Sequence, residues 1–318
     1  MKVLVTGGAG YIGSHVVMLL CDEGHDVVVL DDLSLGTKEA VDKRALFIEG
    51  SILNNDDLSR SLSDVKIVIH LAAYKSAGES MQDPQKYSQN NVLGSKRLIS
   101  AMIENKIKNI IFSSSAAVYG APEYLPLDEK HPLKPINHYG YTKLQTEKTI
   151  YLYGNEGQIT FANLRYFNAA GYDARGRIST QEKNPANLIP SVMEVATGIR
   201  DKLLVYGDNF DTVDGTGIRD YVHVSDLARA HLAAIELISN NQSATINLGS
   251  EKQYSVMDVI RMTEKITGKE IPYEVVERRD GDPDKIYASS ENAKNILKWS
   301  AKESELDNII ETTWRIYK

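Results

Sequence analysis

The sequence predicts an α/β fold in which a doubly wound, parallel Rossmann-like sheet carries helices on both faces. Three observations support this prediction. Short β-branched runs alternate with longer helical patterns through the first half of the chain, and these runs are apolar throughout. Continuous apolar strands are typical of a parallel sheet whose two faces are both covered. The third observation is a glycine-rich turn at residues 6–13, between the first predicted strand and the first predicted helix.

The first half begins with a predicted strand at Lys2–Thr6 and a predicted helix at Tyr11–Glu23, which Gly24 ends. The strand pattern then returns as short runs rich in valine and isoleucine. These predicted strands are Asp26–Leu30, Leu46–Ile48, Lys66–His70 and Asn109–Ser113. The clearest of the later helices is predicted at Gln85–Glu104. Together these elements predict a first domain over residues 1–168.

After about Phe167 the alternation becomes less regular. The segment Gly171–Pro185 is polar and rich in turn-forming residues, which predicts a long loop. Further helices and strands follow it. The helices are predicted at Leu188–Thr197, Ser225–Ile238, Val256–Ile266 and Glu303–Ile316, and the strands at Leu203–Tyr206 and Thr245–Leu248. We interpret residues 169–318 as a smaller C-terminal α/β domain that covers substrate, with segments around 219–250 returning to the first domain.

The composition limits the classes of function. The chain has 318 residues and a formal net charge of −7, which gives no reason to expect a nucleic acid partner. Cys21 is the only cysteine, so an intrachain disulfide and a cysteine-based zinc site are excluded. The histidines lack the spacing of metal ligands, and we predict no metal site. No apolar run approaches the ~20 residues that cross a bilayer, and the first residues run straight into a strand. We therefore expect a cytoplasmic protein without membrane contact.

The glycine-rich turn has the spacing of a dinucleotide-binding loop. Gly7, Gly10 and Gly13 allow a tight turn and let the backbone approach a pyrophosphate at the N-terminus of the following helix. Asp31 and Asp32 follow about 20 residues later, where an acidic residue is expected to bind the ribose 2′-hydroxyl. Because a carboxylate there would repel a 2′-phosphate, the pattern favours NAD over NADP. The alternative is that Asp31 only caps the end of its strand.

Tyr139 and Lys143 lie four residues apart, which places them on one face of a helix. A tyrosine with an ordinary pKa of about 10 is a poor base at neutral pH. An ammonium group one turn away, together with a positive nicotinamide ring, would lower the pKa of Tyr139. The phenol could then accept a proton from a sugar hydroxyl. Most isolated pairs at this spacing are ordinary exposed helix pairs, but the glycine loop upstream favours a catalytic pair.

A serine cluster follows the last predicted strand of the first half. Residues 113–120 have the sequence SSSAAVYG. The carboxyl ends of the strands hold the site in doubly wound folds, so a hydroxyl there could hydrogen-bond the reacting oxygen and pass on its proton. Serines are also common in turns after strands, so the cluster alone is only moderately specific.

Taken in order, TGGAGYIG, Asp31, HLAA at residues 70–73, SSSAAVYG and the Tyr139–Lys143 pair resemble the extended short-chain dehydrogenase/reductases. Further motifs narrow the resemblance to the UDP-glucose 4-epimerases of that family and extend it over almost the whole chain. These are KSAGES at residues 75–80, NNV at 90–92, RYFN at 165–168, DGTGIRDYVH at 214–223 and RDGD at 279–282.

The resemblance implies an enzyme that interconverts UDP-galactose and UDP-glucose by transient oxidation at sugar C4, with bound NAD and with Tyr139 as base and acid. The implied catalytic residues are Tyr139, Lys143 and Ser115. The implied NAD contacts are Gly7, Gly10, Tyr11, Ile12, Gly13, Asp31, Asp32, Leu33, Ser34, Gly36, Ser51, Ile52, Leu71, Ala72, Ala73, Lys75, Asn90, Ser113, Tyr139, Lys143 and Phe167. The implied UDP-sugar contacts are Ser115, Asn168, Asn187, Leu188, Leu204, Tyr206, Arg219, Arg279 and Asp282. Among these, Arg219 and Arg279 would clamp the diphosphate, since guanidinium groups suit phosphate geometry.

Two positions depart from the family pattern. Ser51 stands before Ile52, where the family usually has an aspartate near the adenine. Ile286 stands at the position that resembles the gate of the sugar pocket, and it is neither the bulky tyrosine nor a small residue. Acceptance of N-acetylated UDP-sugars is therefore left open by the sequence.

Three alternatives follow from this pattern: an epimerase for UDP-N-acetylglucosamine, a nucleotide-sugar 4,6-dehydratase, and a non-catalytic NAD-binding protein. Dehydratases usually carry an acidic pair soon after the serines, where this chain has Ala116 and Ala117. A non-catalytic protein is expected to have lost the Tyr–Lys pair, which is present. The resemblance also implies a homodimer, with Gln85–Glu104 and Tyr139–Tyr153 as candidate interface helices.

Overall fold

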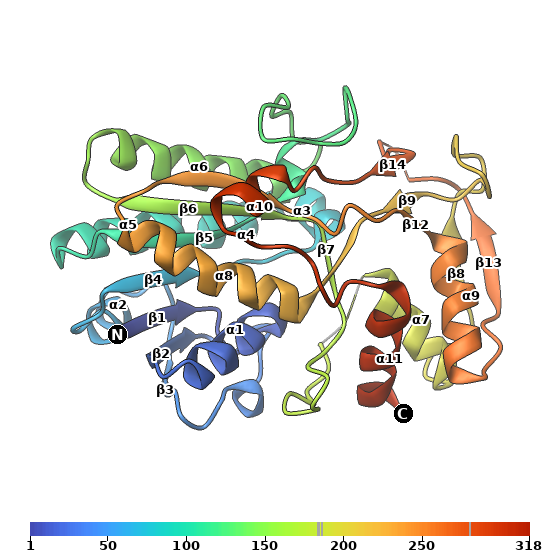
Figure 1. Cartoon of the computed structure of the whole chain (residues 1–318), viewed down its shortest axis with the longest axis horizontal. Coiled ribbons are helices and arrows are strands. Elements are labelled where there is room, and N and C mark those ends of the chain that lie inside the picture. The colour runs from blue at the N-terminus through green and yellow to red at the C-terminus, as the bar shows by residue number, and fades with distance from the viewer. Residues whose placement is uncertain (183–184, 186, 280) are drawn as a thin grey trace.

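One parallel sheet of seven strands, counted over the described residues, confirms the predicted fold class (Figure 1). The structure is a computed structural model that describes residues 1–318 except 183, 184, 186 and 280. The strands of the sheet are β1 (Lys2–Thr6), β2 (Asp26–Asp31), β3 (Leu46–Glu49), β4 (Ile67–His70), β5 (Asn109–Ser115), β6 (Thr160–Tyr166) and β11 (Ala244–Leu248). Their order is β11-β6-β5-β4-β1-β2-β3, and each neighbouring pair is parallel.

Helices cover both faces of this sheet, as Figure 1 shows. One face packs against α1 (Tyr11–Asp22) and α8 (Val224–Ser239), which also contact each other. The other face packs against α2 (Asn55–Ser61), α5 (Ser95–Glu104) and α6 (His138–Asn155). The sheet is therefore buried on both sides, which explains why its strands are apolar throughout.

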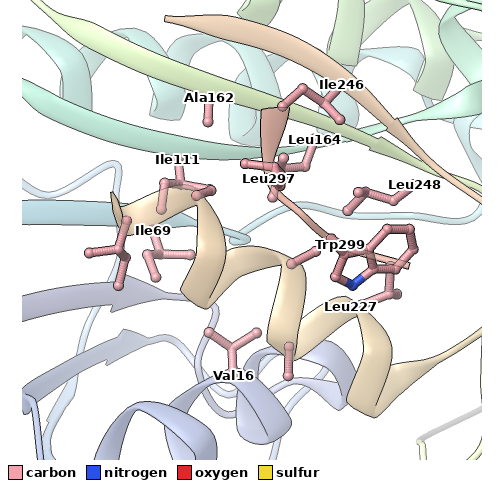
Figure 2. Packing of buried hydrophobic residues seen from close by; sticks show 14 of the residues in the cluster. Val16, Ile69, Ile111, Ala162, Leu164, Leu227, Ile246, Leu248, Leu297 and Trp299 are labelled. Carbon is pink, nitrogen blue, oxygen red and sulfur yellow. The ribbon is translucent and has the colours of Figure 1, made fainter. Parts of the chain in front are cut away.

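Successive residues of each strand enter two separate apolar cores. In β1, Val3 and Val5 join the cluster under α1 and α8, whereas Leu4 joins the cluster on the opposite face. Figure 2 shows the first cluster, in which Ile69 of β4 and Ile111 of β5 are fully buried. Burying such an aliphatic side chain contributes about 1.5–3 kcal/mol relative to leaving it exposed.

The strand order reverses direction at β1, which has β4 on one side and β2 on the other. In doubly wound sheets, ligands bind at this switch point, beyond the carboxyl ends of the strands. The glycine-rich turn leaves β1 at this point and leads directly into α1. The fold therefore places the motif that the sequence singled out at the crevice where a ligand is expected.

The remaining elements lie beyond the ends toward which the β1, β4 and β5 strands point (Figure 1). Small sheets pair β7 (Asn168–Ala170) with β10 (Tyr221–His223), β8 (Leu203–Tyr206) with β13 (Tyr273–Val276), and β9 (Ile218–Arg219) with both β12 (Tyr254–Ser255) and β14 (Lys285–Ile286). The helices α7 (Leu188–Ala196), α9 (Val256–Thr267) and α11 (Leu306–Tyr317) pack in a third apolar cluster. Short helices complete the chain: η1 (Lys38–Ala40), α3 (Ala77–Gln82), η3 (Ala116–Val118) and α10 (Glu291–Ile296).

The prediction of one regular helix at Gln85–Glu104 is wrong in its middle. A π-helical segment, η2 (Ser88–Gly94), joins α4 (Pro84–Tyr87) to α5. Asn91 in this segment is buried, and its amide accepts a hydrogen bond from Tyr74 N at 2.9 Å and donates one to Tyr74 O at 3.0 Å. A π turn changes the direction of side chains relative to a regular helix, and such turns are frequent at functional sites. Apolar periodicity does not reveal it.

Most other predicted elements agree with the structure within a few residues at their ends. The division at residues 168 and 169 stays a prediction, because α8 and β11 from the second half pack on and extend the first sheet. Lys183 and Asn184 of the predicted loop, and Asp280 of the RDGD motif, lie outside the described residues. None of the helices in the described part of the chain has both the length and the apolar character of a bilayer span.

The packing in Figure 2 predicts that Ile111→Ala lowers the free energy of unfolding by about 2–5 kcal/mol, because it leaves a cavity between two buried strands. Ile199→Ala, at a side chain that is 68% exposed, should change it by less than about 0.5 kcal/mol. Urea unfolding followed by circular dichroism measures both. Equal effects of the two substitutions would contradict the assigned core.

Candidate active site

A cleft of about 1290 Å³ lies at the carboxyl ends of β1, β2 and β4. That volume includes the open mouth of the cleft. Most of the predicted cofactor residues line it: Gly7, Gly10, Tyr11, Ile12, Gly13, Asp31, Asp32, Ser34, Gly36, Ser51, Ile52, Leu71, Ala72, Ala73, Lys75, Asn90, Tyr139 and Lys143. The structure therefore brings together residues that are far apart in the sequence, since Gly7 and Lys143 are separated by 136 positions.

The glycine loop is packed too tightly for larger residues. A Cβ on Gly13 would lie 2.1 Å from the carbonyl oxygen of Gly7, and Gly7 itself has a φ of +74°. Gly10 caps α1 and offers no side-chain acceptor to the amides of the first turn. The positive end of the helix therefore faces the cleft with no capping side chain from Gly10, which fits the binding of a phosphate group.

Asp31 both lines the cleft and holds the loops around it. Its carboxylate accepts the N–H of Ala9 at 2.9 Å and the N–H of Leu33 at 2.9 Å. The two interpretations of Asp31 are therefore compatible: it stabilises the strand end, and it also presents an acidic group to the cleft. A negative charge at this position fits NAD better than a cofactor with a 2′-phosphate.

Three predicted cofactor residues do not line the cleft. Leu33 packs against the first apolar cluster, and Phe167 lies within it at 8% exposure. Ser113 is fully buried, and its carbonyl oxygen accepts a hydrogen bond from Lys143 Nζ at 2.8 Å. A direct role of these residues in cofactor binding stays a prediction.

Tyr139 and Lys143 lie one turn apart at the start of α6, where Asn137 caps the helix by accepting the N–H of Gly140 at 2.8 Å. The ammonium nitrogen of Lys143 is 5.8 Å from the centroid of the Tyr139 ring and 4.9 Å from that of Phe112. Both members of the pair line the cleft. The pair is thus arranged as the sequence predicts.

The lowering of the Tyr139 pKa by Lys143 together with a nicotinamide ring stays a prediction, and in the protein chain alone burial dominates. Burial raises the pKa of the Tyr139 phenol to about 12, while a hydrogen bond with Ser115 acts in the opposite direction. Burial also lowers the pKa of Lys143 to about 7, and the nearby carboxylate of Glu147 opposes that shift. The sequence argument omitted this removal from water, which disfavours the charged form of both groups.

The three serines after β5 have different surroundings. Ser113 Oγ contacts His231 Nε2 at 2.8 Å, and Ser114 Oγ donates to Glu147 at 2.5 Å, so both are occupied inside the protein. Ser115 caps the short helix η3 by accepting the N–H of Ala117 at 3.2 Å. Only Ser115 also reaches the Tyr139 hydroxyl. The arrangement selects Ser115 as the serine that could share a reacting oxygen with Tyr139.

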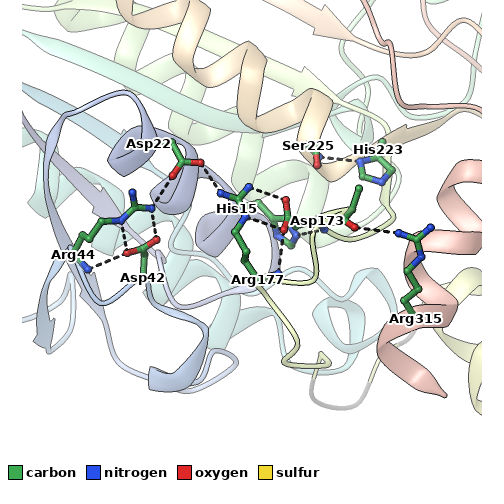
Figure 3. Close-up of polar contacts among 10 residues, drawn as sticks. His15, Asp22, Asp42, Arg44, Asp173, Arg177, His223, Ser225 and Arg315 are labelled. Atoms are coloured by element: carbon green, nitrogen blue, oxygen red, sulfur yellow. Dashed lines mark hydrogen bonds and ion pairs between the residues drawn. The ribbon is translucent and has the colours of Figure 1, made fainter.

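A loop after β7 is tied to α1 by the polar contacts in Figure 3. His15 Nε2 accepts the N–H of Asp173 at 3.1 Å, and burial lowers the pKa of His15 to about 4, so this ring is neutral. Arg177 bridges the carboxylates of Asp173 at 2.8 Å and Asp22 at 2.7 Å. In addition, Tyr11 donates its hydroxyl to the carbonyl of Gly171 at 2.5 Å.

These contacts hold the end of the loop over the cleft. Its residues Ile178, Thr180, Gln181 and Glu182 form part of the lining, and Glu182 makes an ion pair with Lys75 across it. The sequence analysis recognised the segment as a loop but did not assign it to the site. Tyr166, which also lines the cleft, was likewise missed as a site residue. Only its place beside Phe167 in the RYFN motif pointed to it.

The predicted UDP-sugar residues are spread over the small sheets and α7. Arg219 forms an ion pair with Asp282, and the guanidinium of Arg279 lies 3.7 Å from the centroid of the Tyr206 ring. Asn187 caps α7 with an exposed side chain, and Leu188 begins that helix. Leu204 lies on β8 and Asn168 on β7. Within this set, the structure thus shows two pairs in contact, and the binding roles of the whole set stay predictions.

The fold and the cleft define a nicotinamide-dependent enzyme with a tyrosine–lysine pair. The chain belongs to the NAD dependent epimerase/dehydratase family, whose model matches residues 3–249. Within that family it is similar to proteins named UDP-glucose 4-epimerase. The protein of that name from Lactobacillus helveticus is 44% identical over 100% of this chain and 97% of its own length.

Solved structures agree with this placement. The UDP-glucose 4-epimerase from Brucella ovis, in complex with NAD, has a TM-score of 0.96 and 41% identity, with 99% of this chain and 98% of that chain covered. The enzyme from Bifidobacterium longum, in complex with NAD+ and UDP, has a TM-score of 0.93 and 36% identity, with 99% and 98% covered. The cofactor of the present protein is NAD, and the glycine loop, Asp31 and the pair on α6 fit it.

The packing at Gly13 predicts that Gly13→Ala abolishes NAD retention, because the new Cβ forces α1 away from the glycine loop. Gly78→Ala is the matched control, since a Cβ there meets no atom within 4 Å. The measurement is the amount of NAD released per chain when each purified variant is denatured. Full NAD content in Gly13→Ala would contradict the close packing of the loop.

Proposed function

We propose that this protein is a UDP-glucose 4-epimerase, an isomerase that interconverts UDP-galactose and UDP-glucose while its NAD stays bound. The main support is that Tyr139 and Lys143 line the same cleft as the glycine loop and Asp31, while Ser115 hydrogen-bonds to Tyr139. The relatives named above carry the same activity in their names over the full length of this chain.

In this proposal, NAD held by the glycine loop and Asp31 would supply the hydride acceptor and donor for C4 of the sugar. Tyr139 accepts the proton of the 4-hydroxyl during oxidation and gives a proton back during reduction. Ser115, in hydrogen-bond contact with Tyr139, holds the same oxygen. Because burial raises the pKa of Tyr139 to about 12, proton acceptance at neutral pH requires positive charge beside the phenol. Lys143 supplies part of that charge from the same helix face.

The nucleotide end of the substrate would be held by the second half of the chain. Arg219 and Arg279 suit a diphosphate, and Tyr206 offers an aromatic face beside Arg279. In the protein alone Arg219 is paired with Asp282, so binding a diphosphate would share or replace that partner. Firm contacts at this end and few at the sugar would let the 4-keto sugar turn between the two half-reactions.

Three positions among the described residues bear on the alternatives to this function. Ala116 and Ala117 lie in η3 directly after Ser115, so the positions of the acidic pair of a dehydratase carry methyl groups. Ile286 lies beside Arg219 in the pairing of β14 with β9. A half-buried isoleucine at this position leaves the acceptance of N-acetylated sugars open.

We also propose a homodimer that forms through α6 and the η2–α5 segment. Tyr141 and Leu152, eleven residues apart on α6, lie on one face and are 45% and 57% exposed. Leu93 on the neighbouring η2 is 42% exposed. This proposal agrees with the helices chosen from the sequence. The free thiol of Cys21 supports a reducing compartment, which we propose is the cytoplasm. The acidic net charge supports the absence of nucleic acid as a partner.

Tyr139→Phe should lower kcat by at least about 10²–10⁴-fold, because it removes the acid–base group, and should leave the NAD content unchanged. Tyr273→Phe, at a 46% exposed position on β13 outside the cleft and the proposed interface, is the control and should keep full activity. The assay is conversion of UDP-galactose to UDP-glucose without added cofactor, followed by chromatography. Wild-type turnover in Tyr139→Phe would refute the proposed function.

Leu152→Glu should convert the proposed dimer into monomers, because a carboxylate cannot be buried without a partner at an apolar interface. Ile199→Glu, at an exposed isoleucine outside the proposed interface, should leave the dimer intact. Sedimentation velocity distinguishes the two species. A wild-type protein that sediments as a monomer would remove the basis for the proposed interface.

A further inference from the structure

A buried charged cluster lies directly beneath the catalytic pair. Glu147 is fully buried one turn beyond Lys143 on α6. Its carboxylate accepts two hydrogen bonds from Arg165 of β6, from Nε at 2.9 Å and from Nη2 at 2.6 Å, and a third from Ser114 Oγ at 2.5 Å. We refer to Glu147, Arg165 and Ser114 as the carboxylate cluster.

The carboxylate cluster is anchored on the side away from the cleft. Arg165 Nη1 donates to the hydroxyl of Tyr119 at 3.1 Å, and that hydroxyl donates to Asn247 of β11 at 2.6 Å. The guanidinium of Arg165 also lies 5.0 Å from the centroid of the Tyr119 ring. Contacts from three strands and a loop thus fix the position of the Glu147 carboxylate. The reaction steps described above do not use it.

Tyr139, Lys143 and Glu147 are spaced by four residues each, so they lie along one face of α6. Lys143 is 4% exposed, and its ammonium donates to the carbonyl of Ser113 at 2.8 Å. Ser113 is the residue before Ser114, which itself binds Glu147. The backbone of β5 therefore connects the hydrogen-bond partner of Lys143 to the carboxylate cluster.

We propose that Glu147 is a positioning residue for the proposed reaction: it stabilises the ammonium form of Lys143 from behind and keeps that positive charge beside Tyr139. The inference rests on the proposed function, since it assigns a task to Lys143 in acid–base chemistry. Removing a lysine from water favours its neutral form, and a neutral amine would not favour a phenolate. A carboxylate one turn away stabilises the ammonium form and so opposes this effect of burial on Lys143.

The other groups around Lys143 supply no negative charge. His70 of β4 is neutral, because burial and the Lys143 ammonium lower its pKa to about 3. His231 of α8, which contacts Ser113, has its pKa lowered to about 4 by burial. Burial raises the pKa of the phenol of Tyr166 on β6 well above its ordinary value, so it is uncharged. Arg165 is positive. Among the described residues that face Lys143 from α6, β4, β5, β6 and α8, Glu147 is thus the carboxylate that supports it.

The sign of the effect follows from these surroundings. Burial already lowers the pKa of Lys143 to about 7, and Glu147 raises it. Glu147→Gln removes that support and leaves the Arg165 charge nearby without its partner, so the pKa of Lys143 should fall further. The ammonium is then lost at a lower pH. Activity that depends on it should decline on the alkaline side of the pH profile first.

The test is the pH dependence of kcat for NAD-containing wild type and Glu147→Gln, with UDP-galactose as substrate. We expect the alkaline limb of the variant to move down by about one pH unit, and kcat at neutral pH to fall about tenfold, with KM nearly unchanged. Glu147→Asp keeps the charge and should restore most of the wild-type profile. The tyrosinate difference spectrum of each variant reports Tyr139 ionisation independently of turnover, and the NAD content shows whether each variant is loaded with cofactor.

Two outcomes overturn the inference. One is an active Glu147→Gln variant whose alkaline limb coincides with that of wild type, even if the variant is less stable. The other is a Glu147→Asp variant that is impaired as much as Glu147→Gln. If Glu147→Gln does not fold, Glu147→Asp should still show a smaller shift in the same direction, and an unchanged limb there counts against the inference. Failure of the proposed function is distinguishable, because wild type itself would then not convert UDP-galactose.

Discussion

The close approach of α1 to the glycine loop is the constraint on which the rest of the structure depends. At Gly13 the helix lies so near the carbonyl of Gly7 that only a hydrogen atom fits between them. This contact brings the positive end of α1 to the switch point of the sheet and leaves the cleft open beside Asp31. The same helix also binds the loop after β7 through His15 and Asp22. One packing contact therefore positions both the glycine loop and the loop after β7, which line the cleft.

Burial of ionisable groups is the second theme of the molecule. Tyr139 and Lys143 both lose contact with water, which favours the neutral form of each and works against the ion pair that acid–base chemistry requires. The buried Glu147–Arg165 pair carries its own desolvation cost, which excellent geometry and additional hydrogen bonds offset. A charge cluster of this kind is weak evidence for stability, and its position beneath the catalytic pair is better explained by chemistry than by folding.

The sequence alone predicted the parallel sheet, the glycine loop and the Tyr139–Lys143 pair, because each depends on residues that are close together in the chain. It could not reveal the π turn around Asn91, since a segment of seven residues is too short for a changed apolar periodicity to be recognised. It also missed Glu147, whose partners Ser114 and Arg165 come from separate strands. The burial that raises the pKa of Tyr139 could not be predicted either, because removal from water is a property of the folded protein and not of residue spacing.

The position of β11 at the edge of the large sheet has a consequence for how the protein is made. This strand comes from residues 244–248, yet it pairs with β6, and its Ile246 and Leu248 complete the same apolar cluster as Val3 and Val5. α8, which covers that cluster, ends at Ser239. During synthesis the part of this face that α8 covers therefore stays exposed until more than three quarters of the chain has left the ribosome. The nascent chain must carry an exposed apolar surface for most of that time, so early cofactor capture or chaperone binding would protect it from aggregation.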